Sequence, residues 1–185
     1  MSNNGLLAGK KVYLSSPMEC IINDKENEWH NQREYVKEEL ASRFGLKVYD
    51  PYDGDENRGS HLQDIQDAKK ARNFVKLSEI FHKTVRIDLR LVDRSDIIIA
   101  YTPKGVCSVG VPHEIVVANN AKKPVLLVEG TDSLNISLWY YGFIPYECMF
   151  GKWEHLFNYL KDVDYGNITN NRWSNLQIDT PTGWE

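Results

Sequence analysis

Cysteine is scarce in this sequence, and the three residues present are far apart. They stand at positions 20, 107 and 148, with neither a Cys-x-x-Cys pair nor a His-x-x-x-His companion. This spacing argues against a disulfide framework and against a zinc site built on thiolates. It is typical of a reducing compartment, and we therefore expect a cytoplasmic protein that holds no metal.

Long apolar segments and an excess of positive charge are also missing. No stretch approaches the ~20 apolar residues of a membrane-spanning helix, and the opening MSNNGLLAGKK lacks the cationic segment and apolar run of a secretory signal. The 22 basic and 26 acidic residues give a formal net charge of −4. We expect neither a membrane nor a nucleic-acid polymer as partner, because both attract basic surfaces. A small molecule is favoured instead.

Several nucleotide-binding and hydrolase motifs are absent as well. The pairs Gly9-Lys10 and Gly151-Lys152 are followed by Lys and Trp, so there is no Walker-type phosphate loop. A dinucleotide-binding fold would place glycines after the first strand, where this chain has SSPMEC. No Gly-x-Ser-x-Gly nucleophile elbow occurs. These absences argue against ATP chemistry, NAD binding and a serine hydrolase.

The sequence does contain short β-branched runs that alternate with amphipathic segments. Strands are predicted at 10–16, early in 46–59, at 95–101 and at 123–129, and helices at 26–44, 61–82, 83–94, 112–121, 135–142 and 153–161. The run SDIIIAY is almost wholly apolar, as expected for a strand covered on both faces of a parallel sheet. We therefore predict an α/β fold, a doubly wound, Rossmann-like or flavodoxin-like sheet of five mostly parallel strands flanked by helices.

A single domain accounts for the length of the chain. A chain of 185 residues buries a full core without cross-links. We expect this domain to span residues 1–164 and to be followed by a C-terminal tail, 165–185, without clear periodicity. For Trp173 and Trp184 in the tail, docking on a neighbouring subunit or over the site is one expectation and disorder is the other.

The expected fold indicates where a ligand binds. Open α/β sheets bind ligands beyond the carboxyl ends of their strands. Acidic residues gather around the third strand and the helix after it: Asp88, Asp96 and Glu114. Two carboxylates that converge on one crevice suit glycosidic chemistry, because one attacks the anomeric carbon and the other handles the leaving-group proton. A helix N-terminus would keep the attacking carboxylate ionised.

These residues lie in segments that match a known family. The segments VYLSSP with Tyr13, IDLRLVDRSDIIIAY with Asp88, and SVGVPHEIVVA with Glu114 resemble the nucleoside 2-deoxyribosyltransferase superfamily. That group includes transferases that exchange bases on deoxyribose and N-glycohydrolases of nucleoside 5′-monophosphates. The resemblance runs from about residue 11 to 142, and its most specific part is Asp88 followed 26 positions later by Glu114.

The resemblance implies a role for each of these side chains. Glu114 is similar to the family nucleophile, which attacks C1′ and forms a covalent glycosyl-enzyme as the base leaves. Asp88 is similar to the carboxylate that contacts the base and manages its proton, and Tyr13 to the hydroxyl that holds the nucleophile. No cofactor is expected, since these groups cover the required roles.

The resemblance also implies four substrate-binding residues, namely Ser15, Ser108, Gly110 and Asn135. Two of them point to different reactions on a nucleoside or nucleotide. A serine at the position of Ser108 is typical of the monophosphate hydrolases. An asparagine at the position of Asn135 is typical of transferases, which lend it across a subunit interface, so transfer to a free base and hydrolysis both stay open. A homodimer or larger homo-oligomer is expected, with Trp139 and Tyr140 near the interface.

Each candidate residue also has a purely structural interpretation. Glu114 can be a first-turn acid that complements the helix dipole, Asp88 a solvent-facing acid, and Tyr13 a strand aromatic in the core. Asp96 is expected to be a structural hydrogen-bonding residue at the sheet edge. A non-catalytic nucleotide-binding or sensing protein is a further alternative, favoured by the long, charged segment 54–83.

Overall fold

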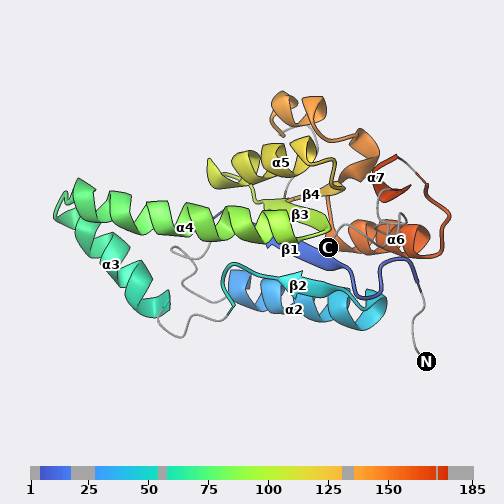
Figure 1. Ribbon diagram of the computed structural model, residues 1–185, viewed down its shortest axis with the longest axis horizontal. Helices are drawn as coiled ribbons and strands as arrows, with labels where there is room; N and C mark the ends of the chain where they lie inside the picture. Colours follow the sequence, from blue (N-terminus) through green and yellow to red (C-terminus); the bar gives the residue numbers. More distant parts are fainter. Residues whose placement is uncertain (1–4, 18–27, 54–57, 131–135, 170, 175–185) are drawn as a thin grey trace, which may run out of the picture.

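A five-stranded parallel sheet forms the centre of the molecule (Figure 1). The computed structural model describes residues 5–17, 28–53, 58–130, 136–169 and 171–174. The strands are β1 (Lys11–Ser15), β2 (Lys47–Tyr49), β3 (Ile97–Thr102), β4 (Val125–Glu129) and β5 (Met149–Phe150). Their order is β2-β1-β3-β4-β5, and all four pairings are parallel. This is the flavodoxin-like order of a doubly wound sheet, so the predicted fold class is confirmed.

Helices cover both faces of the sheet. The α-helices are α2 (Glu28–Phe44), α3 (Arg58–Lys70), α4 (Phe74–Arg94), α5 (Gly110–Asn120), α6 (Trp153–Asp164) and α7 (Asn171–Ser174), and two 3₁₀ helices follow β4, η2 (Leu138–Gly142) and η3 (Tyr146–Cys148). Helices α4 and α5 pack together on one face, and α2 and α6 pack together on the other. None of the described helices is both long and apolar enough to cross a bilayer.

The two central strands hold the core together. The side chains of β3 from Ile97 to Ala100 are fully buried, and those of β4 from Val125 to Val128 are at most 3% exposed. Full burial of a Val, Leu or Ile side chain contributes roughly 1.5–3 kcal/mol relative to exposure. The apolar run that predicted a strand covered on both faces therefore has that position in the structure.

The helical segment before β3 is divided at a different place from the one predicted. A boundary was expected between residues 82 and 83, whereas α3 ends at Lys70 and α4 runs unbroken from Phe74. The turn between them contains Arg72 at a positive φ of 52°, and the side chain of Asn73 accepts a hydrogen bond from the Lys76 amide at 3.0 Å. An asparagine in this position is a strong helix N-cap, which explains the boundary. In Figure 1 the two helices form a hairpin that projects from the sheet.

Helix α7 packs onto the core of its own chain. Trp173 on α7 is 1% exposed, and its indole Nε1 donates to the Tyr159 hydroxyl at 3.0 Å. Arg172 donates to the Lys123 carbonyl at 2.9 Å. Trp173 is therefore a core residue of its own chain, which corrects both expectations for it, docking elsewhere and disorder. Trp184 lies outside the described residues.

Candidate active site

Glu114 lies deeper in its helix than the sequence suggested. Helix α5 begins at Gly110, before Pro112, so Glu114 is its fifth residue and the first turn contains no acid. Proline fits in a first turn, because the N–H that it lacks would have no partner there. The side chain of Glu114 points into the protein and is 8% exposed. A first-turn acid that complements the helix dipole does not describe this position.

Two hydroxyl groups from β1 bind the Glu114 carboxylate. The phenol of Tyr13 donates to Oε1 at 2.9 Å, and the hydroxyl of Ser15 donates to Oε2. Both donors are buried, at 1% and 0% exposure. Since each oxygen has its own donor, the carboxylate is fixed in position and in rotation.

Strand periodicity explains why both hydroxyls reach the same group. Tyr13 and Ser15 are two residues apart, so they point to the same face of β1. They pair in register with Ile98 and Ala100 of β3, the strand against which α5 packs. The face that carries both hydroxyls is therefore the face that α5 covers.

Burial dominates the protonation of Glu114. Loss of hydration raises the pKa of this carboxyl to about 7, against the lowering effect of the hydrogen bonds from Ser15 and Tyr13. The charge of Asp88 raises this pKa further, and the charge of Arg33 lowers it. A helix N-terminus was expected to keep the group ionised, but Glu114 lies beyond the first turn of α5 and desolvation dominates its pKa. Burial also raises the pKa of Tyr13, with the charges of Glu114 and Asp88 adding to the effect, so the phenol stays a proton donor.

Asp88 is a second carboxylate close to Glu114. It lies half-buried on α4, and its charge raises the pKa of three groups, Tyr13, Tyr52 and Glu114. Such an effect requires proximity, so α4 brings Asp88 near Glu114. The structure thus gathers Glu114, Tyr13, Ser15 and Asp88 from three different elements.

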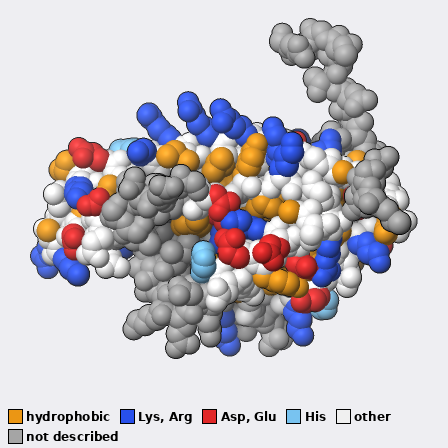
Figure 2. All heavy atoms as spheres, turned by 90° about the horizontal axis from the view of Figure 1, so that it is seen from below, with side chains coloured by type: hydrophobic (Ala, Val, Ile, Leu, Met, Phe, Trp, Pro, Cys, Tyr) orange, Lys and Arg blue, Asp and Glu red, His pale blue; other side chains and the backbone are white. Residues whose placement is uncertain are grey.

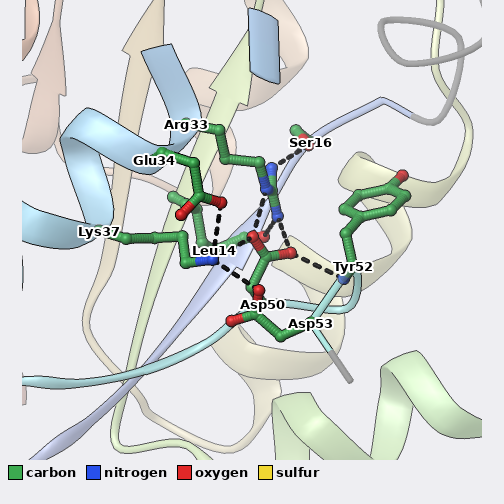
Figure 3. A network of polar contacts seen from close by, with 8 residues as sticks. All are labelled: Leu14, Ser16, Arg33, Glu34, Lys37, Asp50, Tyr52 and Asp53. Carbon is green, nitrogen blue, oxygen red and sulfur yellow. Dashed lines mark hydrogen bonds and ion pairs between the residues drawn. The ribbon is translucent and has the colours of Figure 1, made fainter. Parts of the chain in front are cut away.

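A buried arginine, which sequence reasoning missed, joins the segments beside this site (Figure 3). Arg33 of α2 is 3% exposed and pairs with Asp50 through two hydrogen bonds of 2.7 Å. It also donates to the Leu14 carbonyl at 2.7 Å and to the Ser16 hydroxyl at 2.5 Å. A signal for Arg33 was present, because it follows Trp29 by four residues and precedes Val36 by three, on the apolar face of the helix.

The outer part of this network is an ion-pair cluster. Glu34, Asp50 and Asp53 bring their carboxylates within 4.8 Å of one another, as a cation site would. Lys37 occupies the space between them, at 2.9 Å from Glu34, 2.5 Å from Asp53 and 3.6 Å from Asp50. With Arg33 also bound to Asp50, each of the three carboxylates already pairs with a protein cation, so the cluster is an ion-pair network. Figure 2, seen from the side of α2, shows acidic and basic side chains next to one another near the middle of this face.

Known structures share this architecture. No family model and no curated protein sequence matches the chain. A solved 2-deoxyribosyltransferase from Bacillus psychrosaccharolyticus aligns with a TM-score of 0.53 and 22% identity, over 80% of this chain and 91% of the other. The chain has the fold of a 2-deoxyribosyltransferase. A conserved protein from Enterococcus faecalis V583 aligns with a TM-score of 0.54 and 15% identity over 84% and 99% of the two chains, and a CMP N-glycosidase from Clostridium botulinum with 0.44 and 16% over 82% and 98%.

Within this 2-deoxyribosyltransferase fold, the remaining predicted residues have different positions. Ser108 accepts a hydrogen bond from the Val111 amide at 3.3 Å in the first turn of α5, and the exposed Gly110 begins that helix. The described hydrogen-bond partners of the Glu114 carboxylate are Tyr13 and Ser15, and neither Ser108 nor Gly110 is one of them. Asn135 lies outside the described residues. Asp96 accepts from the Lys11 amide at 2.7 Å, which is the structural role expected for it.

A further buried carboxyl, at the carboxyl end of β4, was also missed. Glu129 ends β4 and is 3% exposed, and its Oε2 has no hydrogen-bond partner within the described part of the chain. Burial raises its pKa. Glu129 lies two residues after Leu127, so the two side chains point to the same face of the sheet. Leu127 pairs with Ala100, and Ala100 pairs with Ser15, so Glu129 shares the face of Ser15. A single glutamate at the end of the apolar run VLLVE is the signal that sequence reasoning passed over.

Proposed function

We propose that this chain cleaves the N-glycosidic bond of deoxyribonucleosides and transfers the sugar to another base. The observation that carries the proposal is the buried Glu114 carboxylate, each oxygen of which is held by a hydroxyl of β1, in a 2-deoxyribosyltransferase fold. A fixed, desolvated carboxylate suits nucleophilic attack on an anomeric carbon, because little reorganisation is needed when the bond forms.

The proposed reaction has two displacements at C1′. In the first, a Glu114 oxygen bonds to C1′ while the bond from C1′ to the base nitrogen breaks, and Asp88 donates a proton to the departing base. In the second, an incoming base gives its proton to Asp88 and attacks C1′, and the bond to Glu114 breaks. Two inversions give net retention of configuration. Tyr13 and Ser15 hold the carboxylate throughout, and no step needs a metal or an organic cofactor.

Hydrolysis of a nucleoside 5′-monophosphate is the second candidate. Ser108 supports it, because its hydroxyl lies at the N-terminus of α5, where backbone amides favour an anionic group. In that reaction, water replaces the incoming base in the second displacement. For either reaction we expect a homo-oligomer, and Leu138 and Trp139 of η2, 84% and 75% exposed, offer apolar surface for it.

A chromatographic assay separates the candidates. The purified protein is incubated with deoxynucleosides and their 5′-monophosphates, each with and without a second free base. A new nucleoside that forms only with the second base supports the transferase, and free base from monophosphates without any acceptor supports the hydrolase. No product from any substrate contradicts both and leaves a nucleotide-binding or sensing protein.

The nucleophile is tested by Glu114→Gln, with Glu154→Gln on the exposed face of α6 as the matched control. We expect the first variant to fold and to lose base release by at least about 10³-fold, because the amide cannot form the glycosyl ester. The control keeps wild-type activity. Intact-protein mass spectrometry after acid quenching should reveal one added deoxyribosyl group in wild type and none in Glu114→Gln. Undiminished base release by Glu114→Gln contradicts the assignment.

A further inference from the structure

Arg33 binds the chain on both sides of Ser15. Its guanidinium donates to the Leu14 carbonyl on one side and to the Ser16 hydroxyl on the other, at 2.7 and 2.5 Å (Figure 3). Ser15 itself donates to Glu114 Oε2. The arginine therefore contacts the two neighbours of a residue that holds the candidate nucleophile.

The end of the sheet ladder explains why this position needs support. The register of β1 with β2 runs from Lys11–Lys47 to Tyr13–Tyr49 and ends there, one residue before Leu14. Beyond that point the Leu14 carbonyl accepts a hydrogen bond from Arg33 of α2 instead of from a β2 amide. The orientation of the Ser15 hydroxyl is thus determined on one side by the ladder to β3 and on the other by this guanidinium.

The guanidinium is itself held rigidly. Asp50 binds it through two parallel hydrogen bonds of 2.7 Å, and the Tyr52 ring lies 4.9 Å from its central carbon. A planar group with donors in a fixed fork makes these contacts together, and a lysine ammonium does not reproduce them. The contacts of Arg33 to Leu14 and Ser16 therefore depend on geometry rather than on charge alone.

We propose that Arg33 is a positioning residue of the active site, which clamps Leu14 and Ser16 so that the Ser15 hydroxyl stays bonded to Glu114. The kinetic part of this inference rests on the proposed function, whereas the structural part does not. Arg33 is not a catalytic residue, because its contacts engage Asp50, Leu14 and Ser16 and none of them reaches Glu114.

The pKa of Glu114 depends on whether Ser15 donates its hydrogen bond to the carboxylate. The groups that act on its carboxyl come from three elements: Tyr13 and Ser15 of β1, Asp88 of α4 and Arg33 of α2. The charge of Glu114 in turn raises the pKa of Tyr52, in the turn after β2. The Ser15 hydrogen bond lowers the pKa of Glu114, so losing it raises that pKa. A change of Arg33 to Lys retains the positive charge near the site but breaks the clamp, so it separates geometry from charge.

The decisive experiment is a titration of the Glu114 carboxyl carbon by NMR in protein labelled with ¹³C-glutamate, with Glu114→Gln identifying the signal. Arg33→Lys, Ser15→Ala and the double variant are compared with wild type. We expect each single variant to raise the pKa of Glu114 above its value of about 7. The double variant should match Ser15→Ala, because Arg33 acts through Ser15. An unchanged pKa in Arg33→Lys, or additive shifts in the double variant, overturns the proposal.

Two further variants keep the test decisive if Arg33→Lys does not fold. Ser16→Ala removes one arm of the clamp and leaves the ion pair of Arg33 with Asp50, so it should raise the pKa of Glu114 by a smaller amount. An unchanged pKa in Ser16→Ala then overturns the proposal. Arg43→Lys on the exposed end of α2 is the matched control and should leave the titration unchanged, since Arg43 pairs with Glu39 of the same helix.

Kinetics then connect the clamp to turnover. Arg33→Lys and Ser15→Ala should each lower kcat for base release by roughly 10- to 100-fold with little change in KM, as expected for a displaced nucleophile. If wild type releases no base from any substrate, the proposed function fails, while the carbon titration still decides the role of Arg33. Wild-type kcat in Arg33→Lys alongside an active wild-type enzyme overturns the inference.

Discussion

The charged form of Glu114 destabilises the fold. Burial raises its pKa from an ordinary 4.5 to about 7, so the folded protein binds this proton more tightly than the unfolded chain does. Such a group leaves stability intact below pH 4.5, and stability falls as the pH rises towards 7. Above pH 7 the full cost applies, on the order of 3 kcal/mol for this shift. The protein tolerates this cost at the position where a nucleophile is proposed.

Replacing this carboxyl with a neutral isostere should therefore stabilise the protein in a pH-dependent way. We expect Glu114→Gln to raise the free energy of unfolding by roughly 1–3 kcal/mol at pH 8.5 and by less than about 1 kcal/mol at pH 5. Urea denaturation of both proteins at both pH values measures the difference. Glu154→Gln on the exposed face of α6 should show no such dependence. An equal gain at pH 5 and pH 8.5 would show that desolvation of Glu114 is not the cause.

At the scale of elements, α4 links the projecting hairpin to the site. It packs against α3, α5 and β1, and the charge of its Asp88 acts on Glu114. Asn73 caps the start of this helix, at the tip of the hairpin. The cap should matter for stability and not for the geometry of Asp88, because the two lie in different parts of the helix.

We expect Asn73→Ala to lower the free energy of unfolding by about 0.5–2 kcal/mol, the usual cost of a lost N-cap. Base release per folded molecule should stay at the wild-type level. The matched control is Asn120→Ala at the exposed C-terminal end of α5, which should lose no stability. Thermal and urea unfolding provide the measurement. A loss of activity without a loss of stability in Asn73→Ala would show that the hairpin tip acts on the site.

At the scale of the whole molecule, helix α7 completes the core after α6, the last long helix. Trp173 packs among buried residues next to Cys148 and Tyr159, and Arg172 ties the same segment to the loop before β4. Trp173 packs on Tyr159 of α6, whereas the hydroxyls that hold Glu114 belong to β1, so the stability of the molecule and the geometry of Glu114 should separate.

Trp173→Ala should be among the most destabilising single changes. Removing a buried indole costs about 3–5 kcal/mol, whereas Trp139→Ala on the exposed η2 should cost less than about 0.5 kcal/mol. Urea unfolding compares the two variants with wild type. At a temperature where Trp173→Ala remains folded, its base release should equal that of wild type. Wild-type stability in Trp173→Ala would contradict the packing of α7.

The hydrophobic patterns of short segments predicted the architecture, because the spacing of apolar residues reflects which side chains are buried. The runs SDIIIAY and KPVLLVE are apolar on both faces, so they indicated strands inside a parallel sheet, and the doubly wound arrangement followed from their alternation with helices. Helix boundaries were predicted less well. The division at 71–73 depends on the cap at Asn73 and on one residue at positive φ, a weaker signal than the helical period on either side.

By itself, the sequence determined the alternation of apolar strands and helices that forms an α/β sheet, because periodicity follows from local burial, and it singled out Tyr13, Asp88 and Glu114 as candidate site residues. Only the tertiary structure decided how those groups interact. It brought two hydroxyls of β1 onto opposite oxygens of Glu114, buried Arg33 in an ion pair beside them, and raised the pKa of Glu114 to about 7. Such contacts join residues roughly 20 to 100 positions apart, and their energies depend on desolvation, which spacing along the chain does not encode.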